Sequence, residues 1–203
     1  MFSLFRKNKS EEKSGPYFPI QTDIHSHILP GIDDGSPDLE TSINLIKGLM
    51  KLGVKRSVAT PHIISDMFRN TPETINAALE KFKAELKKQK INFHVTAAAE
   101  YMMDASFFEM LQRKEKLLTI HDKIILTEFS YATIPHSPQQ MSFAIITEGY
   151  TPILAHPERY PYYYHDYKMY HELSDLGFKL QLNLLSLLGY YGKDAAKASA
   201  YML

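Results

Sequence analysis

Two histidines separated by a single residue, His25 and His27, are the first residues of this sequence that could do chemistry. They lie in the run Asp23-Ile24-His25-Ser26-His27, and on a strand alternate residues project from the same face. Two imidazoles that converge in this way supply half of a metal site. The loop that follows reaches Asp33-Asp34-Gly35 and contains the turn residues needed to bring a carboxylate back. A strand with two surface histidines explains this motif alone equally well.

Further metal-capable side chains follow the ends of other apolar runs. They are His62 in Thr60-Pro61-His62, Glu100 in Ala99-Glu100, Glu128 in Thr127-Glu128-Phe129-Ser130, and His156 in Ala155-His156-Pro157-Glu158-Arg159. Each of these residues alone is more often a structural histidine or a solvated carboxylate. Their joint placement at corresponding positions favours a multinuclear metal site. Because the chain has no cysteine, nitrogen and oxygen must hold any metal, which favours Mn, Fe or Zn.

Strands and helices alternate along the chain, and this order must position the metal-capable residues. Strand-like apolar runs are predicted at 20–28, 54–60, 93–101, 123–129, 151–156 and 178–184. Helices are predicted at 39–52, 74–90, 105–114, 139–149, 163–176 and about 187–203. Strict β-α order with short connections predicts an α/β fold with a parallel sheet, and six units in one domain favour a barrel over an open sheet. In such a barrel the active residues lie at the carboxyl ends of the strands.

A hydroxyl residue followed by proline precedes three of the predicted helices, at Ser36, Thr71 and Ser137. In each pair the hydroxyl can cap the helix and the proline can fill its first position. Gln140 would complete a capping box with Ser137. Three glycines are predicted to end helices just before the next strand: Gly53, Gly149 and Gly177.

The composition is that of a globular protein with a balanced charge. The chain has 203 residues, of which 44% are hydrophobic, and Lys+Arg equals Asp+Glu at 23 each. One domain with a sizeable core is expected, and a nucleic-acid surface built on bulk charge is not. The absence of cysteine excludes a disulfide framework and a thiolate nucleophile within these residues.

The amino-terminal stretch is basic but lacks the apolar core of a signal peptide. Residues 1–16 are predicted to be a mobile tail, and residues 17–203 a single domain. No run is long enough to cross a membrane, so no transmembrane segment is predicted and a cytoplasmic location is expected.

Other histidines and the tyrosines carry a weaker signal. His136 follows the strand of Glu128 and could touch a substrate, although an exposed loop histidine is the favoured interpretation. A tyrosine-rich run extends from Tyr160 to Tyr170. An amphipathic helix that buries these rings is favoured, and the alternative is that one or two of them wall a pocket for an aromatic substrate.

Taken together, these motifs resemble the PHP (polymerase and histidinol phosphatase) superfamily. The closer resemblance is to the bacterial PHP-type protein tyrosine phosphatases linked to capsular and exopolysaccharide synthesis. The matching motifs span about residue 20 to residue 185 and are specific only in combination. The resemblance implies a distorted (β/α)7 barrel with a trinuclear metal centre, most commonly of manganese.

The resemblance also implies a role for each residue. His25, His27 and Glu100 would hold a first metal. Glu100 would bridge to a second metal, held also by Glu128 and His156. Asp34 and His62 would hold a third, and Arg159 would bind phosphate oxygens through its planar guanidinium.

This sequence departs from the family pattern at its carboxyl-terminal end. The family ends its last strand with Asp-x-His, and nothing of that form follows Asn183. Two interpretations are open: a piece of a longer protein, which is favoured, or a variant with an impaired metal centre. The favoured one predicts a domain that lacks its last β/α portion, with an exposed strand edge that favours self-association. Only the second metal site would then have all the ligands that the resemblance implies.

Three functions follow from the resemblance. The first is a metal-dependent phosphatase that hydrolyses phosphotyrosine with metal-activated water and regulates a bacterial tyrosine kinase of capsule synthesis. The second keeps the chemistry but acts on histidinol phosphate or another small phosphomonoester, because the fold does not fix the substrate. The third is a weakly catalytic module that binds a phosphorylated kinase tail.

Overall fold

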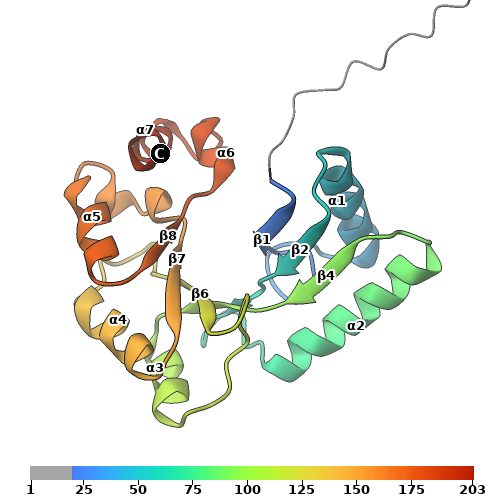
Figure 1. Ribbon diagram of the computed structural model, residues 1–203, viewed down its shortest axis with the longest axis horizontal. Helices are drawn as coiled ribbons and strands as arrows, with labels where there is room; N and C mark the ends of the chain where they lie inside the picture. The colour runs from blue at the N-terminus through green and yellow to red at the C-terminus, as the bar shows by residue number, and fades with distance from the viewer. Residues whose placement is uncertain (1–19) are drawn as a thin grey trace, which may run out of the picture.

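The computed structural model describes residues 20–203, so the predicted tail over residues 1–16 lies outside the described residues. Its strands are β1 (Thr22–Ser26), β2 (Arg56–Ala59), β3 (His62–Ile63), β4 (His94–Ala97), β5 (Glu100–Met102), β6 (Ile124–Glu128), β7 (Thr151–Ala155) and β8 (Lys179–Gln181). Its α-helices are α1 (Leu39–Lys51), α2 (Pro72–Lys88), α3 (Ala105–Gln112), α4 (Pro138–Thr147), α5 (Lys168–Asp175), α6 (Leu184–Leu187) and α7 (Lys193–Met202). Strands and helices alternate along most of the chain, as the sequence predicts (Figure 1).

All strand pairs are parallel, and they form two sheets with the orders β1-β2-β4 and β3-β5-β6-β7-β8. The two sheets meet where β2 runs into β3 through Thr60-Pro61, and where β4 runs into β5. Two backbone hydrogen bonds cross this junction, from Ala98 N to Ala59 O (2.8 Å) and from Glu100 N to Pro61 O (3.1 Å). Proline has no N–H to donate, which explains why the ladder is interrupted there. The strands therefore follow one another in the order expected of a curved parallel sheet.

The outer strands of this arrangement are β1 and β8. Within residues 20–203 no backbone ladder joins them. They are linked instead through side chains, because the Nδ1 of His25 on β1 lies 2.8 Å from Oε1 of Gln181 on β8.

Several element boundaries differ from the sequence prediction. The strand expected over 93–101 is two strands, β4 and β5, separated by Ala98 and Ala99. The helix expected over about 187–203 begins only at Lys193, as α7, because Gly189 and Gly192 adopt φ of 76° and 97°, and the short helix α6 precedes it. The helix expected from residue 163 begins at Lys168, after two 3-10 turns at Pro157–Arg159 and Pro161–Tyr163.

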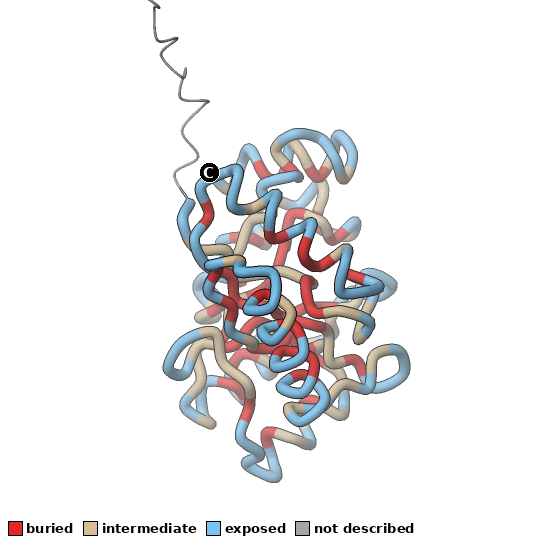
Figure 2. Tube along the Cα trace, turned by 90° about the vertical axis from the view of Figure 1, so that its right-hand side faces the viewer, coloured by how far each residue is buried: buried red, intermediate tan, exposed pale blue. Residues whose placement is uncertain are grey.

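The helices cover the outer face of the strands and bury one hydrophobic core. In Figure 1, α1 and α2 lie beside β1, β2 and β4, while α3, α4 and α5 lie on the side of β6, β7 and β8. Buried residues are concentrated at the centre of the trace and exposed residues at its margin (Figure 2). Phe82 of α2, Phe107 of α3, Phe129 and Phe178 are among the largest fully buried side chains. This core holds in place the strands that carry the metal-capable residues.

In the described part of the chain, no helix is both long enough and apolar enough to span a bilayer.

Candidate metal centre

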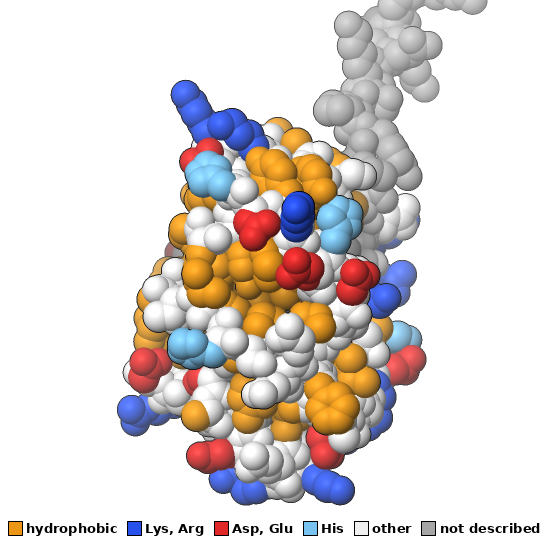
Figure 3. Space-filling model, turned by 90° about the vertical axis from the view of Figure 1, so that its left-hand side faces the viewer, with side chains coloured by type: hydrophobic (Ala, Val, Ile, Leu, Met, Phe, Trp, Pro, Cys, Tyr) orange, Lys and Arg blue, Asp and Glu red, His pale blue; other side chains and the backbone are white. Residues whose placement is uncertain are grey.

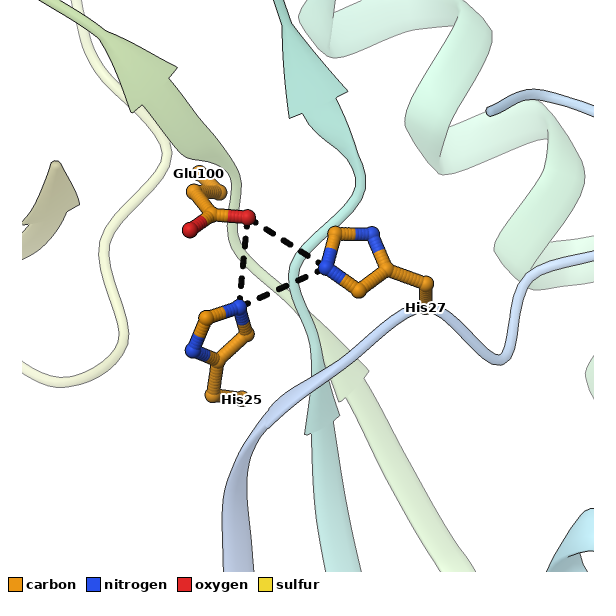
Figure 4. Close-up of side chains that lie close together, drawn as sticks. All are labelled: His25, His27 and Glu100. Carbon is orange, nitrogen blue, oxygen red and sulfur yellow. Dashed lines mark hydrogen bonds and ion pairs between the residues drawn. The ribbon is translucent and has the colours of Figure 1, made fainter. Parts of the chain in front are cut away.

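Glu100 is the centre around which the other candidate residues gather. It is the first residue of β5, and its side chain is completely buried. Its Oε2 lies 3.2 Å from Nε2 of His25 and 3.3 Å from Nε2 of His27, and the two Nε2 atoms are 3.4 Å apart (Figure 4). Both histidines come from β1 or its end, as their spacing predicts. Three possible ligand atoms therefore face one small volume.

His62 joins this cluster from β3. Its Nδ1 lies 2.8 Å from Oε1 of Glu128 and 3.2 Å from Oε2 of Glu100. Glu128 ends β6 and is buried. On the other side of the ring, Nε2 of His62 lies 3.5 Å from Oδ1 of Asp34, whose side chain is 65% exposed. His62 thus connects the buried carboxylates to the outer edge of the cluster.

His156 reaches Glu100 from the end of β7. Its Nε2 lies 3.0 Å from Oε1 of Glu100, and its backbone has a left-handed φ of 35°. The structure groups ligand atoms of His25, His27 and Glu100, of His27, Asp34 and His62, and of His62, Glu100 and Glu128. The first group has the composition that the sequence resemblance implies. In the third, His62 stands beside the two glutamates, where the resemblance places His156.

The loop that carries Asp33 and Asp34 approaches His27 very closely at Gly35. A Cβ atom on Gly35 would overlap the carbonyl oxygen and the Cβ of His27. The backbone N–H of Ser36 donates to the carbonyl of His27 at 3.0 Å, which closes the loop. Only glycine allows this return of the chain, and the return brings the two aspartates to the histidines.

Three histidines of the cluster are held through their second ring nitrogen. The Nδ1 of His27 lies 2.7 Å from Oδ2 of Asp33, that of His25 lies 2.8 Å from Oε1 of Gln181, and that of His156 lies 3.1 Å from the hydroxyl of Tyr131. The Asp33 and Gln181 oxygens accept the Nδ1 proton, so the Nε2 atoms of these two rings are directed at Glu100. Such partners fix ring orientation and tautomer in metal sites. Sequence reasoning assigned no role to Asp33, Gln181 or Tyr131. Only Asp33 carried a signal, as part of the Asp-Asp-Gly loop.

Burial and mutual charge shift the pKa values of the cluster strongly. Burial alone would lower the pKa of His27, but hydrogen bonds to Asp33 and Glu100 raise it to about 10. Burial would also lower the pKa of His25, yet the charge of Glu100 raises it above its usual value. In turn, although burial opposes ionisation, the neighbouring histidines hold the pKa of Glu100 well below its ordinary value. In the absence of metal, protons on the histidines therefore balance the buried carboxylate.

Two further groups of the cluster, Glu128 and His156, have pKa values shifted toward their uncharged forms. Burial and then the charge of Glu100 raise the pKa of Glu128. Burial lowers the pKa of His156, so this histidine favours its neutral form. A second buried carboxylate and a neutral imidazole are suitable ligands for a divalent cation.

The residues present fit a metal centre on two counts. First, three buried polar atoms of the cluster lie close together but make no hydrogen bond of acceptable geometry: Nδ1 of His62, Oε2 of Glu100 and Oε1 of Glu128. Atoms of this kind are costly to bury unless something satisfies them. Second, the donors are all imidazole nitrogen and carboxylate oxygen, which suit Mn, Fe and Zn.

Arg159 lies beside this cluster and has no carboxylate partner. Among residues 20–203 no aspartate or glutamate oxygen is within 4.0 Å of its guanidinium. Instead its Cζ lies 4.1 Å from the ring centroid of Tyr191 and 5.3 Å from that of Tyr131. A half-buried guanidinium without an ion pair can bind an anion.

The tyrosine-rich run is largely core. Tyr160, Tyr163 and Tyr170 are buried as expected, but of these three only Tyr170 lies on an α-helix, so the run is not the amphipathic helix that was favoured. The hydroxyl of Tyr160 donates to the carbonyl of Ala155 at 3.1 Å. His136 is an exposed loop residue, also as favoured. The rings near Arg159 thus belong to Tyr131 and Tyr191, outside the run.

Two surface pockets lie apart from the metal-capable cluster. One lies between α4 and the end of α5, lined by Phe143, Ile146 and Leu176, on the face where hydrophobic side chains gather in Figure 3. The other is lined by Ile63, Tyr101 and the start of α2. Ile63 and Tyr101 follow His62 and Glu100 directly on their strands, so their side chains point to the opposite face. Neither pocket contains a residue of the cluster.

Comparison with known proteins gives one consistent result. The family model "Capsular polysaccharide synthesis, CpsB/CapC" matches residues 21–203. Tyrosine-protein phosphatase YwqE of Bacillus subtilis (strain 168) is 31% identical over 173 residues, which are 85% of this chain and 68% of the relative. The putative tyrosine-protein phosphatase CapC of Staphylococcus aureus is 32% identical over 183 residues, or 89% of this chain and 71% of the relative.

A solved structure agrees with the sequence relatives. It is described as belonging to YwqE from Bacillus subtilis and CpsB from Streptococcus pneumoniae, unique metal-dependent tyrosine phosphatases. It is similar with a TM-score of 0.80 at 30% identity, over 88% of this chain and 72% of that chain. The α/β fold with parallel strands is therefore shared with that structure.

Proposed function

The chain belongs to the CpsB/CapC family of capsular polysaccharide synthesis proteins, and from this premise we propose that it is a metal-dependent protein tyrosine phosphatase. The observation that carries the proposal is the convergence of His25, His27, His62 and His156 on the buried carboxylate of Glu100, with the unpaired Arg159 beside them. Phosphate ester hydrolysis needs cations at the phosphate oxygens and an activated water, and this arrangement can supply both.

The proposed ligands are the residues that the sequence resemblance implies. His25, His27 and Glu100 would hold one metal ion, and Glu100, Glu128 and His156 a second. Asp34 and His62 would contribute to a third. When bound, divalent ions here would lower the pKa of a coordinated water and offset charge on the phosphate. Manganese is the metal we propose.

The chain's own residues have three tasks in this proposal. Glu100 places one carboxylate between ligands from β1 and β7, so it sets their spacing. Asp33 and Gln181 keep the Nε2 atoms of His27 and His25 directed at the metals. Arg159 binds phosphate oxygens and stabilises the charge that develops on them. The chain has no cysteine, so none of its residues offers a thiolate nucleophile.

Further parts of the proposal concern the setting of the enzyme. We propose a tyrosine-phosphorylated kinase of capsule synthesis as the substrate and a cytoplasmic location. We also propose that the fold is of the PHP type, a distorted barrel. The order of the strands, with β1 and β8 at the edges and their side chains in contact, supports this class.

The test is hydrolysis of a phosphotyrosine peptide by purified protein stripped of metal and then given Mn²⁺. Activity should vanish with chelator and return with Mn²⁺, and Glu100→Gln should abolish it. The control is Glu80→Gln, which changes an exposed carboxylate on α2 in the same way. Activity that resists chelation and survives Glu100→Gln would overturn the proposal.

Arg159→Ala adds a second arm to this experiment. Because the guanidinium is expected to contact phosphate and not metal, the variant should keep its metal content. Its activation free energy should rise by about 2 kcal/mol, so that turnover falls roughly 30-fold. A variant that loses its metals instead would make Arg159 a structural residue. Relative kcat/KM values on phosphotyrosine peptide and on histidinol phosphate separate the protein phosphatase from a small-molecule phosphatase.

A further inference from the structure

Two tyrosine rings from separate segments lie against the guanidinium of Arg159. Tyr131 follows β6, and Tyr191 lies between α6 and α7. The Arg159 Cζ is 4.1 Å from the Tyr191 ring centroid and 5.3 Å from the Tyr131 ring centroid. Nothing in the family comparison or the sequence pattern assigns a role to either ring.

Each ring is itself held in place. The Tyr131 hydroxyl lies 3.1 Å from Nδ1 of His156, and its ring lies 5.2 Å from that of Tyr160. The Tyr191 hydroxyl accepts from Nδ2 of Asn183 at 3.5 Å. Tyr131 is 39% exposed, so this ring lies at the surface beside the metal-capable cluster. Arg159 therefore packs against two rings whose positions are fixed, and the hydroxyl of one of them, Tyr131, contacts the proposed metal ligand His156.

The chemistry of a guanidinium explains why packing against aromatic rings would help it to bind an anion. Its faces are attracted to aromatic rings, whereas its N–H donors lie in its plane. Rings against the faces leave the edge free for bidentate contact with phosphate oxygens. In the described part of the chain no aspartate or glutamate forms an ion pair with Arg159. Packing against aromatic rings also limits the rotamers of a long arginine side chain, so less side-chain conformational entropy is lost when it binds a ligand.

We propose that Tyr131 and Tyr191 are positioning residues, whose rings hold the Arg159 guanidinium ready for the phosphate group of the substrate. This inference rests on the proposed function, because it takes the ligand of Arg159 to be a phosphate ester. Because the rings act through their faces, phenylalanine at position 191 should serve as well as tyrosine, whereas phenylalanine at position 131 keeps the ring but loses the hydroxyl contact with His156. Neither ring is expected to bind metal.

The test measures binding of inorganic phosphate to Mn²⁺-loaded protein by calorimetry, together with KM and kcat on a phosphotyrosine peptide. Tyr191→Leu removes one ring, and Tyr191→Phe is its matched control. Tyr131→Leu is compared with Tyr131→Phe, because both variants lose the hydroxyl that contacts His156 and only the first loses the ring. Each leucine variant should bind phosphate roughly tenfold more weakly and raise KM, since one cation–π contact is lost. Tyr191→Phe should stay near wild type, and metal content should be unchanged in both Tyr191 variants. The two Tyr131 variants should have the same metal content as each other, so the difference in phosphate binding between them reports the ring alone. In an Arg159→Ala background, removing a ring should have no further effect.

Three results would overturn this inference. They are leucine variants that bind phosphate like wild type, ring effects that persist without Arg159, and a wild-type protein that binds no phosphate. The proposed function fails in a different way, namely if wild-type protein binds phosphate but does not hydrolyse the peptide. Calorimetry then still decides whether the rings hold Arg159.

Discussion

Glu100 is the residue on which the candidate site depends most. Its carboxylate lies within 3.3 Å of ring nitrogens of His25, His27, His62 and His156, and it is fully buried. Burial of a charge at this depth is costly unless opposite charges surround it. Here the surrounding charge is supplied by protons or by metal ions.

The first prediction compares Glu100→Gln with Asp34→Asn. Glu100 is expected to contribute to two metal sites, whereas Asp34 is exposed and contributes to one. Glu100→Gln should therefore lose more metal, as measured by elemental analysis of protein dialysed against Mn²⁺. Equal losses in the two variants would show that Glu100 does not bridge.

The second prediction concerns pH. Hydrogen bonds to Asp33 and Glu100, acting against burial, raise the pKa of His27 to about 10, so metal-free protein still carries this proton at pH 8. A metal ion must displace the proton, because only the free Nε2 lone pair can bind it. Mn²⁺ affinity should therefore rise steadily from pH 6.5 toward pH 9, with proton release on binding. Calorimetry in buffers of different ionisation enthalpy measures that release, and an affinity independent of pH would contradict the assignment.

Residue types and their spacing were enough to predict which residues converge at the inner part of the candidate site. His25, His27, His62, Glu100 and Glu128 were predicted from strand ends, and the fold brings them together. The partners of their second ring nitrogens were harder to predict. Gln181 and Tyr131 are common residue types without a motif, and only the packing of β8 and of the loop after β6 places them at His25 and His156.

At the scale of the element, the loop between β1 and α1 depends on Gly35. The third prediction is that Gly35→Ala disrupts this loop, because the new Cβ would overlap the backbone of His27. The variant should be destabilised by about 1–3 kcal/mol in denaturant unfolding and should bind less metal. Gly48→Ala in α1 is the control, since no atom lies within 4 Å of its added Cβ, and it should stabilise the protein by about 0.5–1 kcal/mol. Similar behaviour of the two variants would mean that the loop tolerates a side chain.

Helix boundaries show where local sequence is a reliable guide. Thr71 caps α2 with a capping box to Thr74, so that cap was predicted correctly. Ser36 does not cap α1. Asp38 does, accepting from Thr41 N at 2.7 Å, and the Ser36 hydroxyl donates to the Asp38 carbonyl instead. Ser137 precedes α4 with Pro138 in the first turn but makes no side-chain cap, so the capping box with Gln140 was wrong.

The glycines behaved as the sequence predicts. Gly53, Gly149 and Gly177 follow α1, α4 and α5 with φ of 91°, 81° and 98°. Glycine adopts positive φ without strain, so the type of this one residue is enough to predict where the helix ends. A helix cap depends on which of several nearby polar side chains reaches the helix end, and this is determined by the conformation of the whole preceding loop.

At the scale of the whole molecule, the alternation of apolar runs and helices predicted the parallel strands and their order. It did not predict the interruption of the sheet at Pro61, because the sequence shows a proline but not which neighbour needs its N–H. The six expected strands became eight because the run expected over 93–101 is divided into β4 and β5, and because β3 follows Pro61, beyond the run expected over 54–60. The metal-capable residues nevertheless converge. Glu128 and His156 come from the carboxyl ends of β6 and β7, as expected, whereas His62 and Glu100 are the first residues of β3 and β5.

Anomalous diffraction from crystals grown with Mn²⁺ tests the metal centre most directly. The expected result is an anomalous peak within bonding distance of the Glu100 carboxylate and of the Nε2 atoms of His25 and His27, with a second peak that shares Glu100 with Glu128 and His156. Crystals of Glu100→Gln should lose both peaks. Well-ordered wild-type crystals without an anomalous peak at Glu100, from protein that hydrolyses phosphotyrosine, would show that the catalytic centre lies elsewhere in the molecule.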